Sequence, residues 1–305
     1  MRRDHWSTRI EQLDPATDHH EIFRILAAHE FPWDITQALS FALFRTYAVP
    51  SIGALLARTG EFTRRAQKRY DDTALLLDAI LEHGSDSPTG RTAVRRMNQM
   101  HRSYDISDED MRYVLSTLVV MPVRWVDRYG YRSFTARERT ATVNHFREVG
   151  RQMGIPALPA TYQEFADLLD RYEREHFGTD AGGRAVADAT LDLFATFPAN
   201  RWLPRRLVRS VAYALMDDRL LDAFGYPRPA PWQRAVVQGA LRLRGGLLRW
   251  FPARREPFYA RQLRSVRSYP QGYDVAALGT FPHRPSAAGG DTATGEDATG
   301  ETAGD

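Results

Sequence analysis

The sequence predicts an all-α protein that folds as one large helical domain, and three observations support this class. Apolar residues recur at helical spacing in one segment after another, whereas alternation with a period of two is nowhere sustained. Capping residues, glycines and prolines mark where these segments start and stop. The chain has 305 residues, of which 43% are hydrophobic, so it can bury a sizeable core.

The first elements lie in the amino-terminal part of the chain. Residues 1–30 are polar and carry several histidines, and a helical pattern emerges around EIFRILAAHE, so we expect a partly helical amino-terminal extension. A helix is predicted over residues 34–48, because the apolar residues keep helical spacing until Pro50 interrupts them. Another helix is expected to open near Ser51.

A long helix is predicted over residues 61–83, with Gly84 as its carboxy-terminal stop. The segment SDSPTG, residues 85–90, has the composition of a turn, and the helix that restarts after it carries Met97 and His101. The spacing of the long helix predicts a buried face made of Tyr70, Thr73, Ala74, Leu77, Ile80 and Leu81.

Capping residues indicate three further helices. Ser107, followed by acidic residues in the first turn, marks the start of one, and Thr135 is the expected cap of the next. Thr161 begins the third, and Glu164 three residues later predicts a capping box.

The carboxy-terminal part is expected to add helices over residues 183–197, 204–224 and 231–250. We therefore expect one helical domain over residues 31–285. Residues 286–305 contain small, hydroxylated and acidic residues with nothing to bury, which predicts a disordered acidic tail.

Composition excludes several kinds of chemistry. Cysteine is absent, so disulfides, thiolate nucleophiles, iron–sulfur clusters and zinc–cysteine sites are excluded. The net charge of +3 is typical of an ordinary soluble surface, and we expect no nucleic-acid partner. The amino terminus lacks the apolar core of a secretory signal, and no uncharged run approaches the roughly 18–20 residues of a membrane span. A cytoplasmic location is expected, and the oligomeric state is left open.

Three side chains are predicted to share one pocket. Arg69 and Thr73 lie four residues apart, on one face of their helix. His101 lies on the following helix after a short loop, and helices joined in this way usually pack as antiparallel neighbours.

Around these residues the sequence resembles the MpaB/rubber-oxygenase family, over roughly residues 30–225. The resemblance rests on KRYDDT, GSDSPTGR, MNQMH, DISDEDMRYVLS and RYGYR. It implies a largely helical protein with a haem pocket between core helices, in which haem b is bound through one histidine. The activity it implies is oxidative cleavage of an isoprenoid carbon–carbon double bond by dioxygen.

Carried onto this chain, the resemblance makes His101 the iron ligand and places Arg69 and Thr73 near the haem or on its oxygen side. Met97 suits the lining of such a pocket, because thioethers pack adaptably against aromatic surfaces. Arg132 is expected either to bind the haem propionates or to anchor a helix end.

One position departs from the family pattern. Rubber oxygenases carry a lysine immediately before the threonine, whereas this chain has Asp72 there, and Lys68 lies one helical turn earlier. Polyisoprene is therefore a poor expectation for the substrate. Asp72, if buried beside Arg69, is a candidate base or proton relay.

A second region of interest covers residues 231–258, which mix tryptophans and aliphatic residues with six arginines. Such a segment fits a helix on an anionic membrane surface, giving weak peripheral contact, or a core helix with a solvated face. Gly245 and Gly246 would break a long interfacial helix.

The function expected from the sequence is that of a haem b-dependent oxygenase acting with dioxygen on a hydrophobic, isoprenoid or secondary-metabolite substrate. Two alternatives stay open. The same haem could serve a peroxidase or oxidase that does not cleave an alkene, or the chain could be a non-catalytic helical binding protein in which His101 is merely packed.

Overall fold

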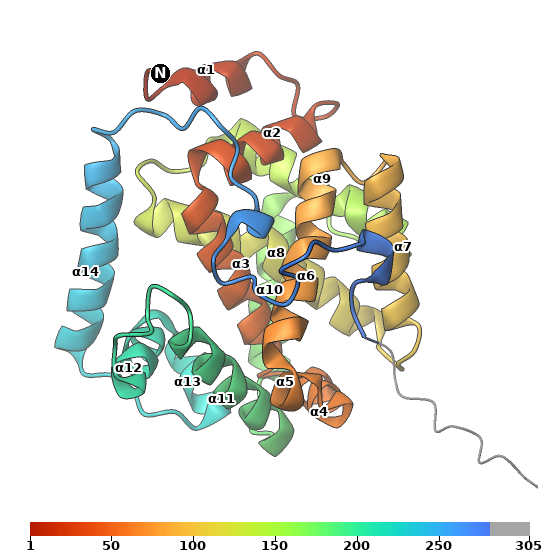
Figure 1. The fold of residues 1–305 in the computed structure, drawn as a ribbon, viewed down its shortest axis with the longest axis vertical. Helices are drawn as coiled ribbons and strands as arrows, with labels where there is room; N and C mark the ends of the chain where they lie inside the picture. Colours follow the sequence, from red (N-terminus) through yellow and green to blue (C-terminus); the bar gives the residue numbers. More distant parts are fainter. Residues whose placement is uncertain (281–305) are drawn as a thin grey trace, which may run out of the picture.

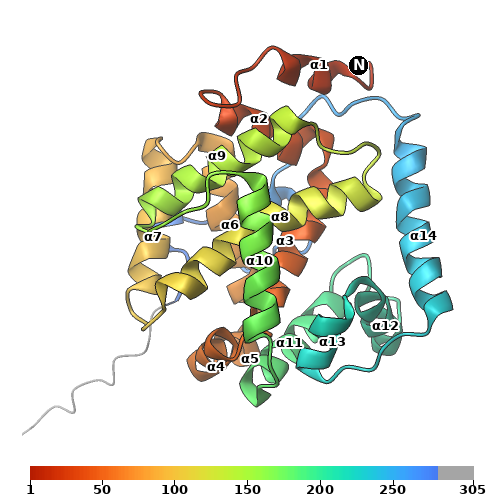
Figure 2. The ribbon, with the colours of Figure 1, turned by 180° about the vertical axis from the view of Figure 1, so that it is seen from behind.

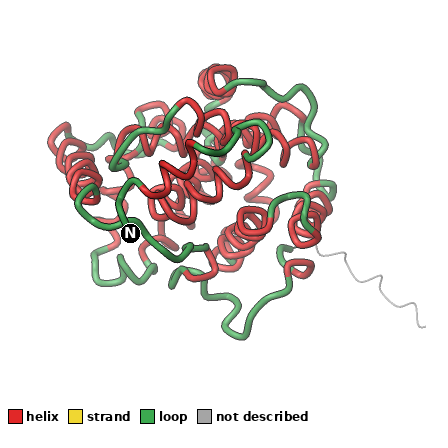
Figure 3. The backbone as a smooth tube through the Cα atoms, turned by 90° about the horizontal axis from the view of Figure 1, so that it is seen from above, coloured by secondary structure: helices red, strands yellow, loops and turns green. Residues whose placement is uncertain are grey.

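The computed structural model describes residues 1–280, and within these residues every regular element is a helix (Figures 1 and 3). The predicted acidic tail over 286–305 lies outside the described residues. The all-α prediction is confirmed. In order, the helices are α1 His5–Glu11, α2 His19–Ile25, the π-helix η1 Leu26–Glu30, α3 Pro32–Thr46, α4 Pro50–Thr59, α5 Glu61–Arg64, α6 Ala66–His83, α7 Pro88–His101, α8 Asp108–Tyr129, α9 Ala136–Gln152, α10 Tyr162–His176, α11 Ala181–Ala195, α12 Arg205–Leu215, α13 Asp218–Phe224, α14 Pro231–Leu248, and the 3₁₀ turns η2 Ala260–Gln262 and η3 Val275–Ala277.

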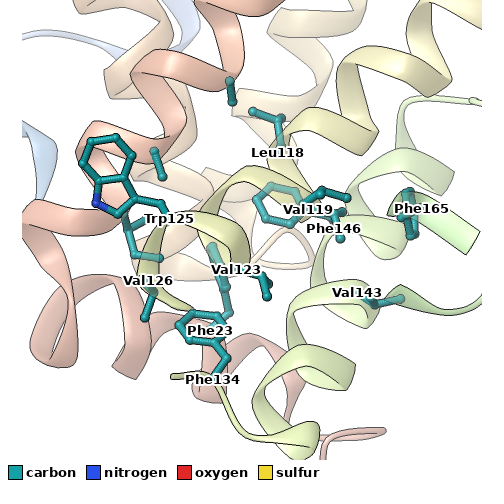
Figure 4. Packing of buried hydrophobic residues seen from close by; sticks show 14 of the residues in the cluster. Phe23, Leu118, Val119, Val123, Trp125, Val126, Phe134, Val143, Phe146 and Phe165 are labelled. Carbon is teal, nitrogen blue, oxygen red and sulfur yellow. The ribbon is translucent and has the colours of Figure 1, made fainter. Parts of the chain in front are cut away.

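Helix α8 forms the centre of the protein, with α3, α9 and α10 packed around it (Figure 2). Val119, Val123 and Val126 are fully buried, and α8 is buried on nearly every side. Aromatic rings from other elements surround it in Figure 4, including Phe23 and Phe165. The predicted amino-terminal extension contributes to the same core, through Ile10, Ile22, Phe23, Ile25 and Leu26.

The predicted caps are found, with one difference. Ser107 accepts a hydrogen bond from the Asp110 N–H (3.0 Å), and Thr135 forms a full capping box with Glu138. Thr161 accepts from the Glu164 N–H (3.2 Å), but the Glu164 carboxylate turns back to the Ala160 N–H (2.7 Å). The acid thus still satisfies a free backbone donor at this helix start, one residue earlier than in a capping box.

Two predicted helices are each split in two, and one helix was not predicted. The segment 61–83 breaks at Arg65, whose backbone leaves the helical conformation, and 204–224 breaks where Asp217 caps α13. Helix α1 lies in a polar stretch that gave no apolar stripe. Within residues 1–280 no single helix has the length and apolarity of a membrane span, although α3 and α4, meeting at 97°, pass that test together on length and composition.

The predicted buried face of α6 is confirmed at Ile80 and wrong at the other positions, because Tyr70, Thr73, Ala74, Leu77 and Leu81 are only partly buried. The residues that are buried are Asp71, Asp72, Leu75, Leu76, Asp78, Ala79 and Ile80. The reason is the segment 259–280, called here the C-terminal segment, which runs across α6 to α7 (Figure 1, blue). This segment supplies hydrogen-bond donors to the buried carboxylates of α6, which would otherwise have to be hydrated by solvent.

Three aspartates of α6, namely Asp71, Asp72 and Asp78, accept hydrogen bonds from this segment. Asp71 accepts hydrogen bonds from the N–H groups of Arg267 (2.9 Å) and Ser268 (2.8 Å) and from the Ser268 hydroxyl (2.6 Å). Asp78 accepts from the N–H groups of Ala260 (2.8 Å) and Arg261 (3.3 Å). Leu278, fully buried between α6 and α7, adds an apolar contact. The segment is therefore part of the folded domain.

Two buried histidines make the protein acid-sensitive. Burial and the charge of Arg24 lower the pKa of His29 to about 4, and burial, reinforced by His20 and His19, holds the pKa of His145 well below its ordinary value. The unfolded chain takes up these protons near pH 6.5, whereas the folded protein resists them, so stability present above that pH is lost as the pH falls. Each histidine contributes up to about 1.4 kcal/mol per pH unit.

Asp78 opposes this loss of stability at low pH. Burial raises its pKa to about 6, so below that pH the folded protein binds a proton that the unfolded chain does not, and this stabilises the folded state. His101, whose pKa burial also lowers to about 4, adds to His29 and His145, so we expect the unfolding free energy to fall by about 1.4–2.8 kcal/mol per unit between about pH 6 and pH 4. Urea unfolding at several pH values measures this slope, and His29→Asn should reduce it. An unfolding free energy that stays constant over this range would contradict the prediction.

Candidate functional site

Helices α6 and α7 form an antiparallel pair, as the short loop predicted. Gly90 permits this close turn, because a Cβ atom there would lie 1.8 Å from the Gly84 carbonyl oxygen. The pairing brings the start of α6 to the end of α7. Arg69 and Thr73 on one helix and His101 on the other therefore lie in the same region.

His101 is the last residue of α7 and is half-buried. Its Nδ1 atom is buried and has no hydrogen-bond partner. Burial, followed by the positive charge of Arg69, lowers the pKa of His101 to about 4, so the imidazole is neutral at physiological pH. The neutral ring is the form in which histidine binds a metal.

Arg69 and Thr73 are joined directly, as their spacing predicted. The guanidinium of Arg69 donates to the Thr73 hydroxyl, which in turn donates to the Arg69 carbonyl oxygen (3.0 Å). The guanidinium also lies over the ring of Phe62, 5.3 Å from its centroid. These contacts fix the cation beside His101.

Sequence reasoning missed three aromatic residues around Arg69. Phe62 packs on Tyr47, with ring centroids 5.3 Å apart. Burial raises the pKa of Tyr47 to about 12, and the charge of Arg69 opposes that shift. Burial and the charge of Glu61 raise the pKa of Tyr104, and Arg69 again opposes. No local pattern marked Phe62 or Tyr104, because they come from the short helix α5 and from the turn after α7.

Asp72 faces the C-terminal segment. Its carboxylate accepts from the Lys68 ammonium (2.7 Å) and from the Tyr269 hydroxyl, and Lys68 also donates to Tyr269 (3.0 Å). The buried carboxylate thus has a cation and a phenol as partners. Its role in proton transfer stays a prediction, and these contacts favour an anchoring role.

Met97, one turn before His101, is partly buried against the apolar cluster between α6, α7 and the C-terminal segment. Met100 contacts the same cluster, and Gly279 approaches it so closely that a Cβ atom there would lie 2.1 Å from its sulfur. The two methionines therefore lie between His101 and the C-terminal segment, on the apolar side of the site.

The structure does not bring Arg132 to His101. Arg132 follows the end of α8, whereas His101 precedes its start, and 22 residues of helix separate these ends by about 33 Å. Arg132 binds Glu30 (3.1 Å) and Glu138 (2.7 Å). Two open grooves lie around Arg132, and neither is lined by His101.

The residues around His101 fit a haem group. Haem iron takes one neutral imidazole, and its propionates need a cation beside an otherwise apolar surface. His101 supplies a neutral ring with a buried, unpartnered nitrogen, and Arg69 supplies the cation beside Phe62. Within residues 1–280 no three His, Asp or Glu side chains converge on a metal site.

The anchoring of the C-terminal segment can be tested with Asp71→Asn. Loss of the buried charge weakens three hydrogen bonds and is expected to cost about 1.5–3 kcal/mol, mostly as detachment of the segment. Trypsin should then cleave after Arg264 and Arg267 at least about tenfold faster. Asp86→Asn, at an exposed position in the turn between α6 and α7, is the control, and equal cleavage rates of the two variants would contradict the anchoring role.

Comparison with known proteins adds a second kind of evidence. Residues 33–250 match the catalytic domain described as ER-bound oxygenase mpaB/B′/rubber oxygenase. The chain is 31% identical over 272 residues to the ER-bound oxygenase mpaB′ of Penicillium brevicompactum, covering 82% of this chain and 63% of the relative. It is 32% identical over 248 residues to the ER-bound oxygenase mpaB of Penicillium roqueforti (strain FM164), covering 74% and 82%.

A third relative, the ER-bound oxygenase mpaB of Penicillium brevicompactum, is 32% identical over 209 residues, which cover 62% of this chain and 53% of the relative. This chain thus spans less than two thirds of the length of both P. brevicompactum proteins. The region that matches the catalytic domain, residues 33–250, includes His101, Arg69 and Thr73 and ends just after α14.

Proposed function

The chain belongs to the family of mpaB-type ER-bound oxygenases and rubber oxygenases, and from this premise we propose that it is a haem b-dependent oxygenase. Its substrates would be dioxygen and a hydrophobic molecule of isoprenoid or secondary-metabolite type, with cleavage of a carbon–carbon double bond as the reaction. The observation that carries the proposal is the neutral imidazole of His101, whose buried Nδ1 has no partner in the protein.

The residues of the site have distinct roles in this proposal. His101 would hold the iron, and Met97 would contribute to the apolar lining. Activation of dioxygen is the chemistry that a bound haem would supply. Arg69 would bind an anionic group, either a propionate or negative charge that develops on oxygen, and Thr73 would keep its guanidinium oriented.

Asp72 and Lys68 separate this chain from the rubber oxygenases that it resembles. Lys68 is bound to Asp72 and Tyr269, so its ammonium is directed to the C-terminal segment. A lysine on the oxygen side of the site is not available from this position. We therefore propose a substrate other than polyisoprene and a reaction that does not depend on a lysine.

Two measurements test the function. The chain is expressed with a haem precursor, and its visible spectrum and haem content are determined. A Soret band with about one haem per chain is expected from a single histidine ligand. Oxygen consumption with isoprenoid-like alkenes, followed by product mass after reaction in labelled dioxygen, then tests the reaction.

Each alternative predicts a different result. A peroxidase or oxidase would bind haem but give products without labelled oxygen. A non-catalytic binding protein would show no Soret band even with added haem, and that result would overturn the proposal. The expected cytoplasmic location also remains a prediction, because the relatives are named ER-bound.

A further inference from the structure

Helix α14 lies at the edge of the molecule in both side views (Figures 1 and 2). It faces the protein with both apolar and polar groups, and Leu241 and Leu248 pack against the main core. Gln238 donates to the Ala214 carbonyl oxygen of α12 (3.2 Å), and Arg244 donates to the buried carboxylate of Asp34 (3.0 Å). Gly245 lies so close to the end of α8 that a Cβ atom would come within 2.3 Å of the Tyr129 carbonyl oxygen. Gly245 therefore allows close packing, Gly246 has open space around it, and neither glycine breaks the helix.

The opposite face of α14 is apolar and exposed. Trp250, just after the helix, is 86% exposed, and the helix itself exposes Trp232, Val236, Leu243 and Leu247. A surface helix of a soluble domain normally presents polar residues to solvent, whereas α14 is apolar on its outer face as well as where Leu241 and Leu248 pack on the core. The outward apolar face of α14 therefore indicates a surface that binds a partner.

Exposed apolar side chains are concentrated in this part of the protein. Of the twelve large hydrophobic side chains exposed within residues 1–280, ten belong to residues 202–251. Those outside α14 and its end lie on α12, which contacts α14, or just before it: Trp202, Leu203, Leu207 and Val211. Trp202 is 82% exposed. We call these residues, with the outer face of α14, the apolar face.

Arginines accompany the apolar face, and acidic residues are missing from it. Neither 199–216 nor 231–255 contains an aspartate or glutamate. Arg242 is exposed on the flank of α14, and Arg205 and Arg206 are exposed on α12. Between α14 and the end of α8 lies an open groove of about 300 Å³, whose lining includes Arg128, Arg132, Arg242 and Arg249. One acid, Asp127, also lines it and is paired with Arg139 (2.8 Å).

We propose that the apolar face docks the protein on the surface of an anionic lipid bilayer. Tryptophans and leucines would enter the boundary between headgroups and acyl chains, while the arginines bind lipid phosphates. Charge complementarity favours this partner over a second copy of the chain, because two such faces would bring their arginines together. The inference is independent of haem binding.

Vesicle co-sedimentation tests the proposal. The full chain is mixed with phosphatidylcholine vesicles, with or without about 30% phosphatidylserine, and the bound fraction is measured. We expect strong binding only to the anionic vesicles. Trp232→Ser/Trp250→Ser should lower the partition coefficient more than about tenfold, because both rings leave the interface. These rings lie outside the core, so circular dichroism and thermal unfolding should match the parent.

Two charge-reversal variants test the role of the arginines in vesicle binding. Arg242→Glu should lower binding to anionic vesicles about tenfold or more, since it reverses one charge near the surface. Arg171→Glu, at an exposed position on α10, makes the same charge change away from the apolar face and should leave binding unchanged. The proposal is overturned if the parent does not bind anionic vesicles, or if Arg171→Glu and Arg242→Glu weaken binding equally. A stable dimer in gel filtration that the tryptophan variant dissociates, without vesicle binding, would instead assign the face to self-association.

Discussion

The variant His101→Ala is expected to lose haem while keeping its fold. His101 is the one protein ligand proposed for the iron, and replacing it removes a coordinate bond. Even the loss of a group that merely orients a metal ligand costs 10–100-fold in affinity, so removal of the ligand itself should cost more than about 100-fold. We expect the Soret band to fall to background in protein prepared identically to the parent.

Three comparisons make this result specific. His83→Ala, at an exposed histidine at the end of α6, should retain the parent spectrum. His101→Gly with added imidazole should recover a Soret band, because the free ligand can occupy the vacated space. Helical circular dichroism should be the same in all variants. Haem content equal to the parent in His101→Ala would show that another residue holds the iron.

The features of this site that could be predicted from the sequence are those set by helix spacing and loop length. Arg69 and Thr73 lie one helical turn apart, and the four-residue turn 84–87 directs α7 back along α6, which carries His101 to them. These relations follow from helix spacing and loop length. Of the two roles expected for Arg132, propionate binding and anchoring of a helix end, its ion pairs with Glu30 and Glu138 fit the second. Nothing in the sequence around Arg132 indicates that the whole length of α8 separates it from His101.

The buried face of α6 shows what sequence reasoning cannot supply. The predicted buried face did not include Asp71 or Asp72, because burying a carboxylate without partners is costly. Their partners lie 196 or 197 residues away, in Arg267, Ser268 and Tyr269. A helical period identifies apolar stripes, but it cannot detect a polar face that a distant segment will cover. The same limit applies to α14, where periodicity left open which face points outward.

The largest effect on stability is expected from Arg45→Met. Arg45 on α3 is buried, and its guanidinium donates to both carboxylate oxygens of Glu173 on α10, with an Nε to Oε1 distance of 2.7 Å. It also binds Asp217, the cap of α13, and Tyr113 of α8 donates to the same Glu173 (3.2 Å). One cation therefore ties together α3, α10 and α13 beside the central helix.

Removing this cation leaves Glu173 as an uncompensated buried charge, and we expect a loss of about 3–5 kcal/mol in unfolding free energy. Denaturant unfolding of parent and variant measures it. Arg228→Met removes an exposed ion pair with Asp222 and should change the unfolding free energy far less than Arg45→Met does. Adding Glu173→Gln to Arg45→Met should recover part of the loss, because the neutral amide can still accept from Tyr113. If Arg45→Met and Arg228→Met had equal effects, the buried pair would contribute no more than a surface pair, and the link between these helices would have to come from apolar packing alone.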